Sequence, residues 1–173
     1  MGYRYLKFFM ERTLYSSGRI TVKLKDRLIK ETKKYKNVLT RSRQSGVNRF
    51  NTAAIIWNMS HDVFGYDKFS EVTIDILNET TCILSIKKNT DFLYLIDVYP
   101  ITYDLGAVNS IQISDYQPYE GMENVVVTDG ISWNVYKIDL NMQPCLTDQF
   151  NFLELDPKDP QDIEVLYKIC RDR

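Results

Sequence analysis

The residues of this chain with the clearest capacity for chemistry are the lysines and arginines of its first quarter. Few acids interrupt them, whereas a solvated helix face usually carries charges of both signs. Such a run can contact the phosphates of a nucleic acid, and contact of that kind is independent of base sequence and weakened by salt. The candidate nucleic-acid-binding residues are Arg19, Lys23, Lys25, Arg27, Lys30, Lys33, Lys34, Lys36, Arg41 and Arg43.

The net charge of the chain, −1, hides a division between its two parts. Residues 1–50 contain 14 of the 22 Lys and Arg but three of the 23 Asp and Glu, so they carry a net charge of +11. The remainder contains eight basic and 20 acidic side chains, a net charge of −12. This division predicts an arm that binds a polyanion, or one that pairs with the acidic body or with an acidic patch on a partner.

The cysteines and the single histidine do not predict a zinc site or a disulfide framework. Cys82, Cys145 and Cys170 are odd in number and far apart, so we expect reduced thiols. No apolar run approaches the roughly 18 residues that a membrane span needs, and the first residues lack a signal-peptide core. We therefore expect a cytoplasmic protein without a membrane partner, in the host cytoplasm if its origin is viral.

Hydrophobic spacing predicts the elements that must position these residues. Apolar residues from Leu24 to Val38 recur at helical intervals, which indicates a basic amphipathic helix. A second helix, over residues 47–67, could be capped by Asn51 and has Gly65 where a C-terminal glycine belongs. The remaining predictions are strands at 71–77, 80–88 and 92–100, a helix at 105–116, a hairpin at 125–139, an edge strand at 150–156 and a helix at 159–171. This order indicates an α/β or α+β sandwich around one mixed sheet.

The hairpin contains more than a hairpin needs. Asp129-Gly130 is a strong turn signal, because glycine tolerates a positive φ. A hairpin turn requires neither the preceding Thr128 nor the following Trp133. For Trp133 we favour packing against the sheet over stacking on a nucleic-acid base.

Several motifs in this order resemble a known family. The first helix ends in Gly-Tyr before a strand, Gln112 and Tyr116 have Gln-x-x-x-Tyr spacing, and Thr128-Asp129-Gly130 is similar to a Thr-Asn-Gly hairpin followed by an aromatic residue. Over residues 46–170 the chain resembles the N-terminal nuclease domain of the restriction subunit of type I restriction enzymes. That domain belongs to the PD-(D/E)xK restriction-endonuclease-like superfamily. The resemblance implies that Gln112 and Tyr116, which share one helix face, contact substrate DNA.

The catalytic residues implied by this resemblance are incomplete. Its acid-x-Lys motif falls on Asp97-Val98-Tyr99, which implies that Asp97 is a relic acid and that Tyr99 replaces the lysine. Apart from the resemblance, Asp97 is equally explained as an acid at a strand end that is solvated or paired with a lysine. The other metal-binding acids fall near Thr81 or Cys82 and near Asn51. Holding Mg²⁺ requires two or three carboxylate oxygens, and a nearby cation must offset charge on the phosphate. In a rearranged site, Asp75 or Asp91 would supply the acid and Lys87 or Lys88 the cation.

These observations predict a restriction-endonuclease-like fold, with a mixed central sheet flanked by helices in residues 46–173 and a basic N-terminal helical extension in residues 1–45. The expected function is nucleic-acid binding, with DNA as the first choice, by a catalytically degenerate nuclease without a cofactor. One alternative is a phage or mobile-element protein that inhibits a host defence complex, with its acidic body imitating DNA. A second alternative is an endonuclease that uses Mg²⁺ in a rearranged site.

Overall fold

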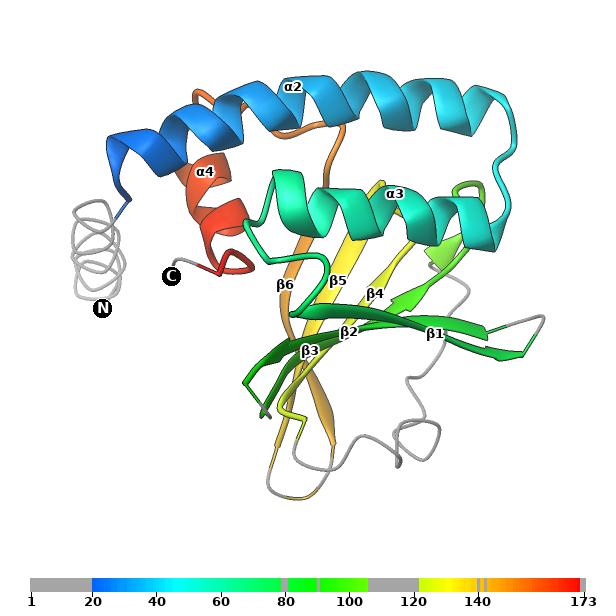
Figure 1. Cartoon of the computed structure of the whole chain (residues 1–173). Coiled ribbons are helices and arrows are strands. Elements are labelled where there is room, and N and C mark those ends of the chain that lie inside the picture. The colour runs from blue at the N-terminus through cyan, green and yellow to red at the C-terminus, as the bar shows by residue number, and fades with distance from the viewer. Residues whose placement is uncertain are drawn as a thin grey trace, which may run out of the picture.

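The computed structural model describes residues 20–78, 81–89, 91–105, 122–139, 141 and 143–171. Among these residues, two helices precede six consecutive strands and one helix follows them, a mixed α+β order (Figure 1). The elements are α2 (Val22–Gln44), α3 (Arg49–Asp62), β1 (Val72–Asn78), β2 (Thr81–Lys88), β3 (Asp91–Val98), β4 (Asn124–Thr128), β5 (Ser132–Ile138), β6 (Pro144–Asn151) and α4 (Pro160–Tyr167).

The six strands form one mixed sheet in the order in which they occur along the chain. Strands β3 and β4 run parallel, with Leu95 opposite Val125 and Val98 opposite Thr128, and the other neighbouring pairs are antiparallel. A parallel pair needs a long crossover between its strands, and residues 99–123 are long enough to provide it. The carboxyl ends of β3 and β4 therefore lie side by side at one end of the sheet.

Helices α2, α3 and α4 pack on one face of the sheet (Figure 1). The main hydrophobic core lies between them and the strands, because the inward residues of each strand alternate with residues of the opposite face. A smaller cluster on the other face includes Ile83, Leu95, Val125 and Val127. The sequence predicts a sheet flanked by helices, one of them at residues 105–116. Residues 106–116 of that helix lie outside the described residues.

Helix α2 confirms the predicted basic amphipathic helix. Thr21 caps it by accepting a hydrogen bond from the Leu24 backbone N–H at 3.3 Å. Its buried residues recur at intervals of three or four and include Leu28, Tyr35 and Leu39. The sequence predicts an extension separate from the domain that follows, whereas these side chains belong to the same core as α3, α4 and the sheet.

Helix α3 confirms the second predicted helix but differs at its start. Asn48, not Asn51, is the N-cap, and its Oδ1 accepts the Asn51 N–H at 3.0 Å. The predicted C-terminal glycine is present at Gly65, which has a φ of 82° and donates its N–H to the His61 carbonyl at 3.0 Å. Asn48 and Asn51 are three residues apart and an asparagine at either position can cap a helix, so the sequence placed the start of α3 one turn too late.

The strand predictions hold for β1 to β5 and fail for the edge strand. Residues 144–151 form β6, whereas most of the predicted strand at 150–156 is a turn beginning at Phe152. Phe152 is fully buried and donates its N–H to the Ile131 carbonyl at 2.7 Å. The apolar residues of this segment therefore fill the core from a turn. Helix α4 confirms the last predicted helix, with Asp159 as N-cap and Pro160 at its start.

None of the helices within the described ranges is long and apolar enough to cross a membrane.

Candidate nucleic-acid interface

The Thr128–Trp133 turn is a buried structural unit at the carboxyl end of β4. Thr128 Oγ1 accepts the Gly130 N–H at 2.8 Å, and Trp133 Nε1–H donates to the Gly130 carbonyl at 2.9 Å. The Trp133 ring is fully buried, stacked on Phe150 at 5.8 Å and edge-on to Phe64 at 5.5 Å. The predicted packing role of Trp133 is confirmed, and the threonine serves to fix the turn.

Asp129 completes this turn with its carboxylate. Its Oδ1 accepts the backbone N–H groups of Ile131 at 2.9 Å and Ser132 at 2.7 Å. Burial raises the pKa of Asp129, although these backbone hydrogen bonds and the charge of Arg43 favour the ionised form. The carboxylate therefore acts as a fixed acceptor at a site where its charge is poorly solvated.

Asp129→Asn is expected to stabilise the protein relative to the wild type as the pH rises. The amide oxygen can accept the same two N–H groups, while the buried charge is removed. Because the pKa of Asp129 is higher in the folded chain than in the unfolded chain, ionisation lowers the stability of the wild type as the pH rises above about 4. Urea unfolding across a pH series measures the difference, and parallel stability profiles of the two proteins would contradict this reading.

The end of β3 brings an acid, a cation and two aromatic rings together. Asp97 is buried on the sheet face opposite the helices, and the Tyr99 N–H donates to the Thr128 carbonyl at 2.8 Å. The Arg49 guanidinium, from the start of α3, lies 4.6 Å from the centre of the Tyr99 ring. The Tyr103 ring lies 4.8 Å from the same ring.

Tyr99 does not supply the positive charge that a lysine would bring. Burial raises the pKa of Tyr99 to about 12, and the Asp97 carboxylate acts in the same direction against the opposing charge of Arg49. The phenol is therefore neutral at physiological pH. The cation at this position is Arg49, which lies over the Tyr99 ring, is distant in the sequence and was not among the predicted site residues.

A candidate for a second metal-binding acid, Asp75, is separated from Asp97 by the strand that lies between them. Asp75 lies opposite Ile83 in β1–β2, and Ile83 lies opposite Asp97 in β2–β3, so one strand separates the two acids. With strands about 4.8 Å apart, their Cα atoms are about 10 Å apart. Cys82 is buried in the main core, where desolvation raises the pKa of its thiol.

The other residues of the predicted rearranged site lie at the far end of β3. Lys88 is opposite Asp91, at the first residue of the strand, whereas Asp97 is near its last residue. Six residues of extended strand span about 20 Å, so Lys87 and Lys88 do not approach Asp97. Within the described ranges, no three His, Cys, Asp or Glu side chains are grouped to hold a metal ion.

A cavity of about 600 Å³ lies beside the carboxyl ends of β3 and β4. Its lining includes Arg43 at the end of α2, Tyr103 after β3, and Ser132, Asn134 and Gln149 from β5 and β6. The Asn134 Oδ1 atom is buried without a hydrogen-bond partner among the described residues. A cavity of this size with converging polar groups is suited to a polar ligand that presents hydrogen-bond donors.

Most cations of α2 form no ion pair with an acid in the part of the chain that the structure describes. Lys34 is the exception that joins two elements, because its Nζ pairs with Asp62 of α3 at 2.7 Å, and the Tyr35 hydroxyl donates to the same carboxylate at 2.8 Å. Lys30 and Lys34 also lie within 3.4 Å of Glu31 in their own helix. Among the described residues, no ion pair is formed by Lys23, Lys25, Lys33, Lys36, Arg41 or Arg43.

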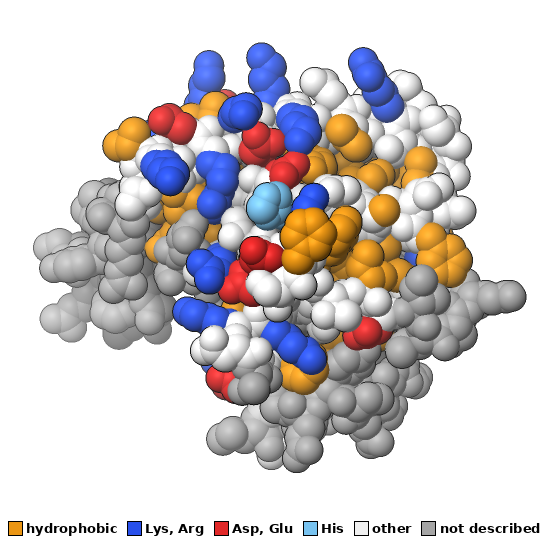
Figure 2. Space-filling model, viewed as in Figure 1, with side chains coloured by type: hydrophobic (Ala, Val, Ile, Leu, Met, Phe, Trp, Pro, Cys, Tyr) orange, Lys and Arg blue, Asp and Glu red, His pale blue; other side chains and the backbone are white. Residues whose placement is uncertain are grey.

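These unpaired cations give α2 a basic outer surface. Figure 2 shows Lys and Arg side chains standing along the edge of the molecule that α2 forms. Arg27 differs from them because it is half-buried against the loop after α3, where a Cβ at Gly65 would lie 2.5 Å from Arg27 Nη1. The internal clasp that the charge division allowed includes, in the described residues, the contact of Lys34 with Asp62 and the charge of Arg43 acting on Asp129.

Some predicted residues lie outside the described part of the chain, and some residues of the interface were not predicted. Arg19, Gln112 and Tyr116 belong to the first group. Arg49 and Asn134 were not predicted, because the residues around each of them come from elements that are far apart in the sequence. The place of Arg49 directly after the N-cap of α3 is a weak signal by which the sequence could have identified it as a candidate site residue.

Comparisons of the chain with models of protein families, with curated proteins and with solved structures find no match.

Proposed function

We propose that this protein binds nucleic acid, with DNA as the first choice, through the outer surface of α2 and the adjoining cavity. The observation that carries this proposal is the row of α2 cations, among them Lys23, Lys33 and Arg41, that form no ion pair with the described residues. Unpaired Lys and Arg side chains on one rigid helix can neutralise successive phosphates. The amide groups of Asn134 and Gln149, beside Arg43 in the cavity, are of the type that hydrogen-bonds to base edges.

The topology supports a restriction-endonuclease-like arrangement for the domain. Helix α3 leads into three antiparallel strands, and a long connection leads to β4, which pairs in parallel with β3. A Thr-Asp-Gly turn then joins β4 to β5. This is the order of elements that the resemblance to type I restriction subunits implies.

The arrangement of carboxylates favours binding without cleavage. Asp97 is the acid at the expected position, its neighbour Asp75 is separated from it by a strand, and the lysine position is occupied by the neutral Tyr99. Hydrolysis of a phosphodiester by this superfamily's chemistry needs two or three carboxylate oxygens on one metal ion. We therefore propose a degenerate nuclease domain that retained its affinity for DNA.

A charge-neutralising pair on α2 tests the proposal. Lys33→Gln with Lys36→Gln is expected to weaken binding to a short duplex and to reduce the slope of log Kd against log salt by about two, or about one per lysine. Lys88→Gln with Lys137→Gln is the matched control. Both control lysines are exposed, and they lie opposite the first residues of β3 and β4, at the far end of the sheet from the cavity.

Fluorescence anisotropy at several salt concentrations, with and without Mg²⁺, measures this effect. Equal salt slopes in the two double variants would show that α2 is not the phosphate-binding surface. Cleavage of plasmid DNA in the presence of Mg²⁺ would replace the binding proposal with a live nuclease. Absence of both binding and cleavage would direct attention to a protein partner, such as a host defence complex.

A further inference from the structure

A group of aromatic side chains is exposed on the outer side of α3. Phe69 is 84% exposed and Phe50 is 41% exposed. The half-buried Trp57 lies edge-on to Phe69, with ring centres 6.3 Å apart at 85°. Residues 50, 54 and 57 recur at helical spacing, so Phe50 and Trp57 lie on one face of α3. We call Phe50, Trp57 and Phe69 the aromatic patch.

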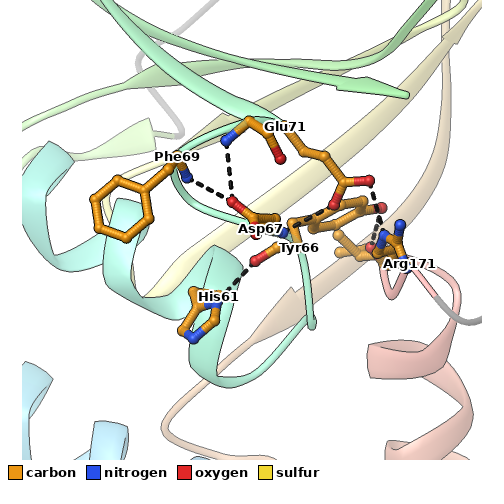
Figure 3. A network of polar contacts seen from close by, with 8 residues as sticks. His61, Tyr66, Asp67, Phe69, Glu71 and Arg171 are labelled. Carbon is orange, nitrogen blue, oxygen red and sulfur yellow. Dashed lines mark hydrogen bonds and ion pairs between the residues drawn. The ribbon is translucent and has the colours of Figure 1, made fainter. Parts of the chain in front are cut away.

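Exposure of Phe69 is imposed by a well-organised turn. The Asp67 Oδ1 atom accepts the N–H groups of Phe69 at 2.9 Å and Ser70 at 3.0 Å, and the Asp67 N–H donates to Glu71 Oε2 at 2.8 Å. Glu71 is paired with Arg171 Nε at 2.8 Å. Figure 3 shows this network, with the Phe69 ring pointing away from it.

Two further contacts anchor the turn to its surroundings. The Tyr66 carbonyl accepts a hydrogen bond from His61 Nδ1 at 2.9 Å, and since a carbonyl can only accept, this nitrogen carries the hydrogen. The Tyr66 hydroxyl donates to the Ile169 carbonyl at 2.8 Å. Because these contacts fix the backbone on either side of Phe69, the turn needs little reordering when a ligand stacks on the ring, which favours binding.

The charges around the patch favour an anionic ligand. Lys68 Nζ lies 5.2 Å from the centre of the Trp57 ring and 5.4 Å from that of Phe69, and it forms no ion pair among the described residues. The acids nearby have local partners: Glu71 pairs with Arg171, Asp62 pairs with Lys34, and the Asp67 carboxylate accepts backbone N–H groups of its own turn. Figure 2 shows hydrophobic side chains gathered over α3 on the same face as the Lys and Arg side chains of α2.

We propose that the aromatic patch stacks an unpaired base of single-stranded nucleic acid, while Lys68 and α2 contact its phosphates. Rigid exposed rings beside cations are the usual means of binding a single strand without sequence preference, because every base has a π-face. The bases of a duplex are already stacked and do not reach such a patch. This inference rests on the proposed function and narrows its ligand to nucleic acid with unpaired bases.

Tryptophan fluorescence isolates the patch from the rest of the protein. The chain has two tryptophans, and Trp133 is fully buried behind Phe64 and Phe150. Titration with an oligothymidylate of about 16 nucleotides, which spans one single-strand site, is expected to quench Trp57. A duplex of equal length is expected to bind without this quenching. Trp57→Phe is expected to abolish the quenching and to retain the affinity, because phenylalanine preserves a stacking ring.

Substitution of Phe69 measures the contribution of stacking to affinity. Phe69→Ala is expected to raise the Kd for the single strand about five- to 150-fold and to leave the Kd for the duplex unchanged. The side chain is exposed, so the fold is not at risk. Leu146→Ala, which shortens a 53% exposed apolar residue of β6, is the matched control and is expected to change neither Kd.

Anisotropy of labelled oligonucleotides, recorded beside the fluorescence, separates this inference from the proposed function. Single-strand binding without quenching, and with an unchanged Kd for Phe69→Ala, would overturn the stacking role and leave nucleic-acid binding intact. Absence of any change in anisotropy for both oligonucleotides would overturn both. Equal quenching by duplex and single strand would overturn the preference for unpaired bases.

Discussion

Trp133→Ala is expected to lower the free energy of unfolding by about 3–5 kcal/mol, the range for loss of a large buried aromatic side chain. The indole fills the core beneath the Thr-Asp-Gly turn, stacked on Phe150 and edge-on to Phe64. The substitution leaves a cavity and also removes the hydrogen bond from Nε1 to the Gly130 carbonyl, which is buried. Urea unfolding followed by far-UV circular dichroism measures the loss.

Trp57→Ala provides the comparison for this prediction. Trp57 is half-buried and packs against the edge of the main core, so we expect a smaller loss, about 1–2 kcal/mol. If Trp133→Ala does not fold, Trp133→Phe extends the series, with an expected loss of about 1–3 kcal/mol. Equal losses for the two alanine variants would contradict the central position of Trp133 in the core.

Gly130→Ala is expected to destabilise the protein by about 2–5 kcal/mol. Gly130 has a φ of 88°, and placing an L-residue in the left-handed region costs about 1–2 kcal/mol. A Cβ at this position would also lie 3.1 Å from Leu39 Cδ2, in the core between the turn and α2. The added strain of a crowded core contributes about 1–3 kcal/mol.

Gly46→Ala separates the two contributions. Gly46 has a φ of 62°, and a Cβ there would meet no heavy atom within 4 Å. Gly46→Ala therefore measures only the cost of placing an L-residue in the left-handed backbone region, about 1–2 kcal/mol. Thermal or urea unfolding of both variants should place Gly130→Ala well below Gly46→Ala. Equal stabilities would show that the turn can move away from α2 without cost, which would contradict a rigid connection between the basic helix and the sheet.

Local patterns were sufficient to predict most of the elements. Helical intervals from Leu24 onward predicted α2, and Asp159-Pro160 predicted the start of α4. Polar turns between apolar runs predicted β1, β2 and β3. These signals work because helix caps and alternating faces depend on neighbours within a few residues along the chain.

The errors occurred where the tertiary structure decided between local alternatives. The apolar residues 150–156 resemble a strand, but Phe152 enters the core from a turn that begins where β6 ends. Its N–H donates a hydrogen bond to the carbonyl of Ile131, which lies in the turn between β4 and β5. Such a partner is invisible in the sequence, because it depends on how β5 and β6 pair.

The candidate interface divides in the same way. The sequence identified the basic residues of α2 and the charge division of the chain, since both are properties of composition. It could not show that Lys34 pairs with Asp62 while Lys33 and Arg41 form no ion pair with the residues that the structure describes, because this depends on the packing of α2 against α3.

By itself, the sequence determined the charge division of the chain, the approximate bounds of most helices and strands and the positive-φ turn at Gly130, because each follows from residue type and short-range spacing. The tertiary structure alone decided that Arg49 is the cation beside Tyr99 and that Phe69 is held exposed next to Trp57. Both arrangements bring together residues on different elements, and their distances arise from packing around a shared core.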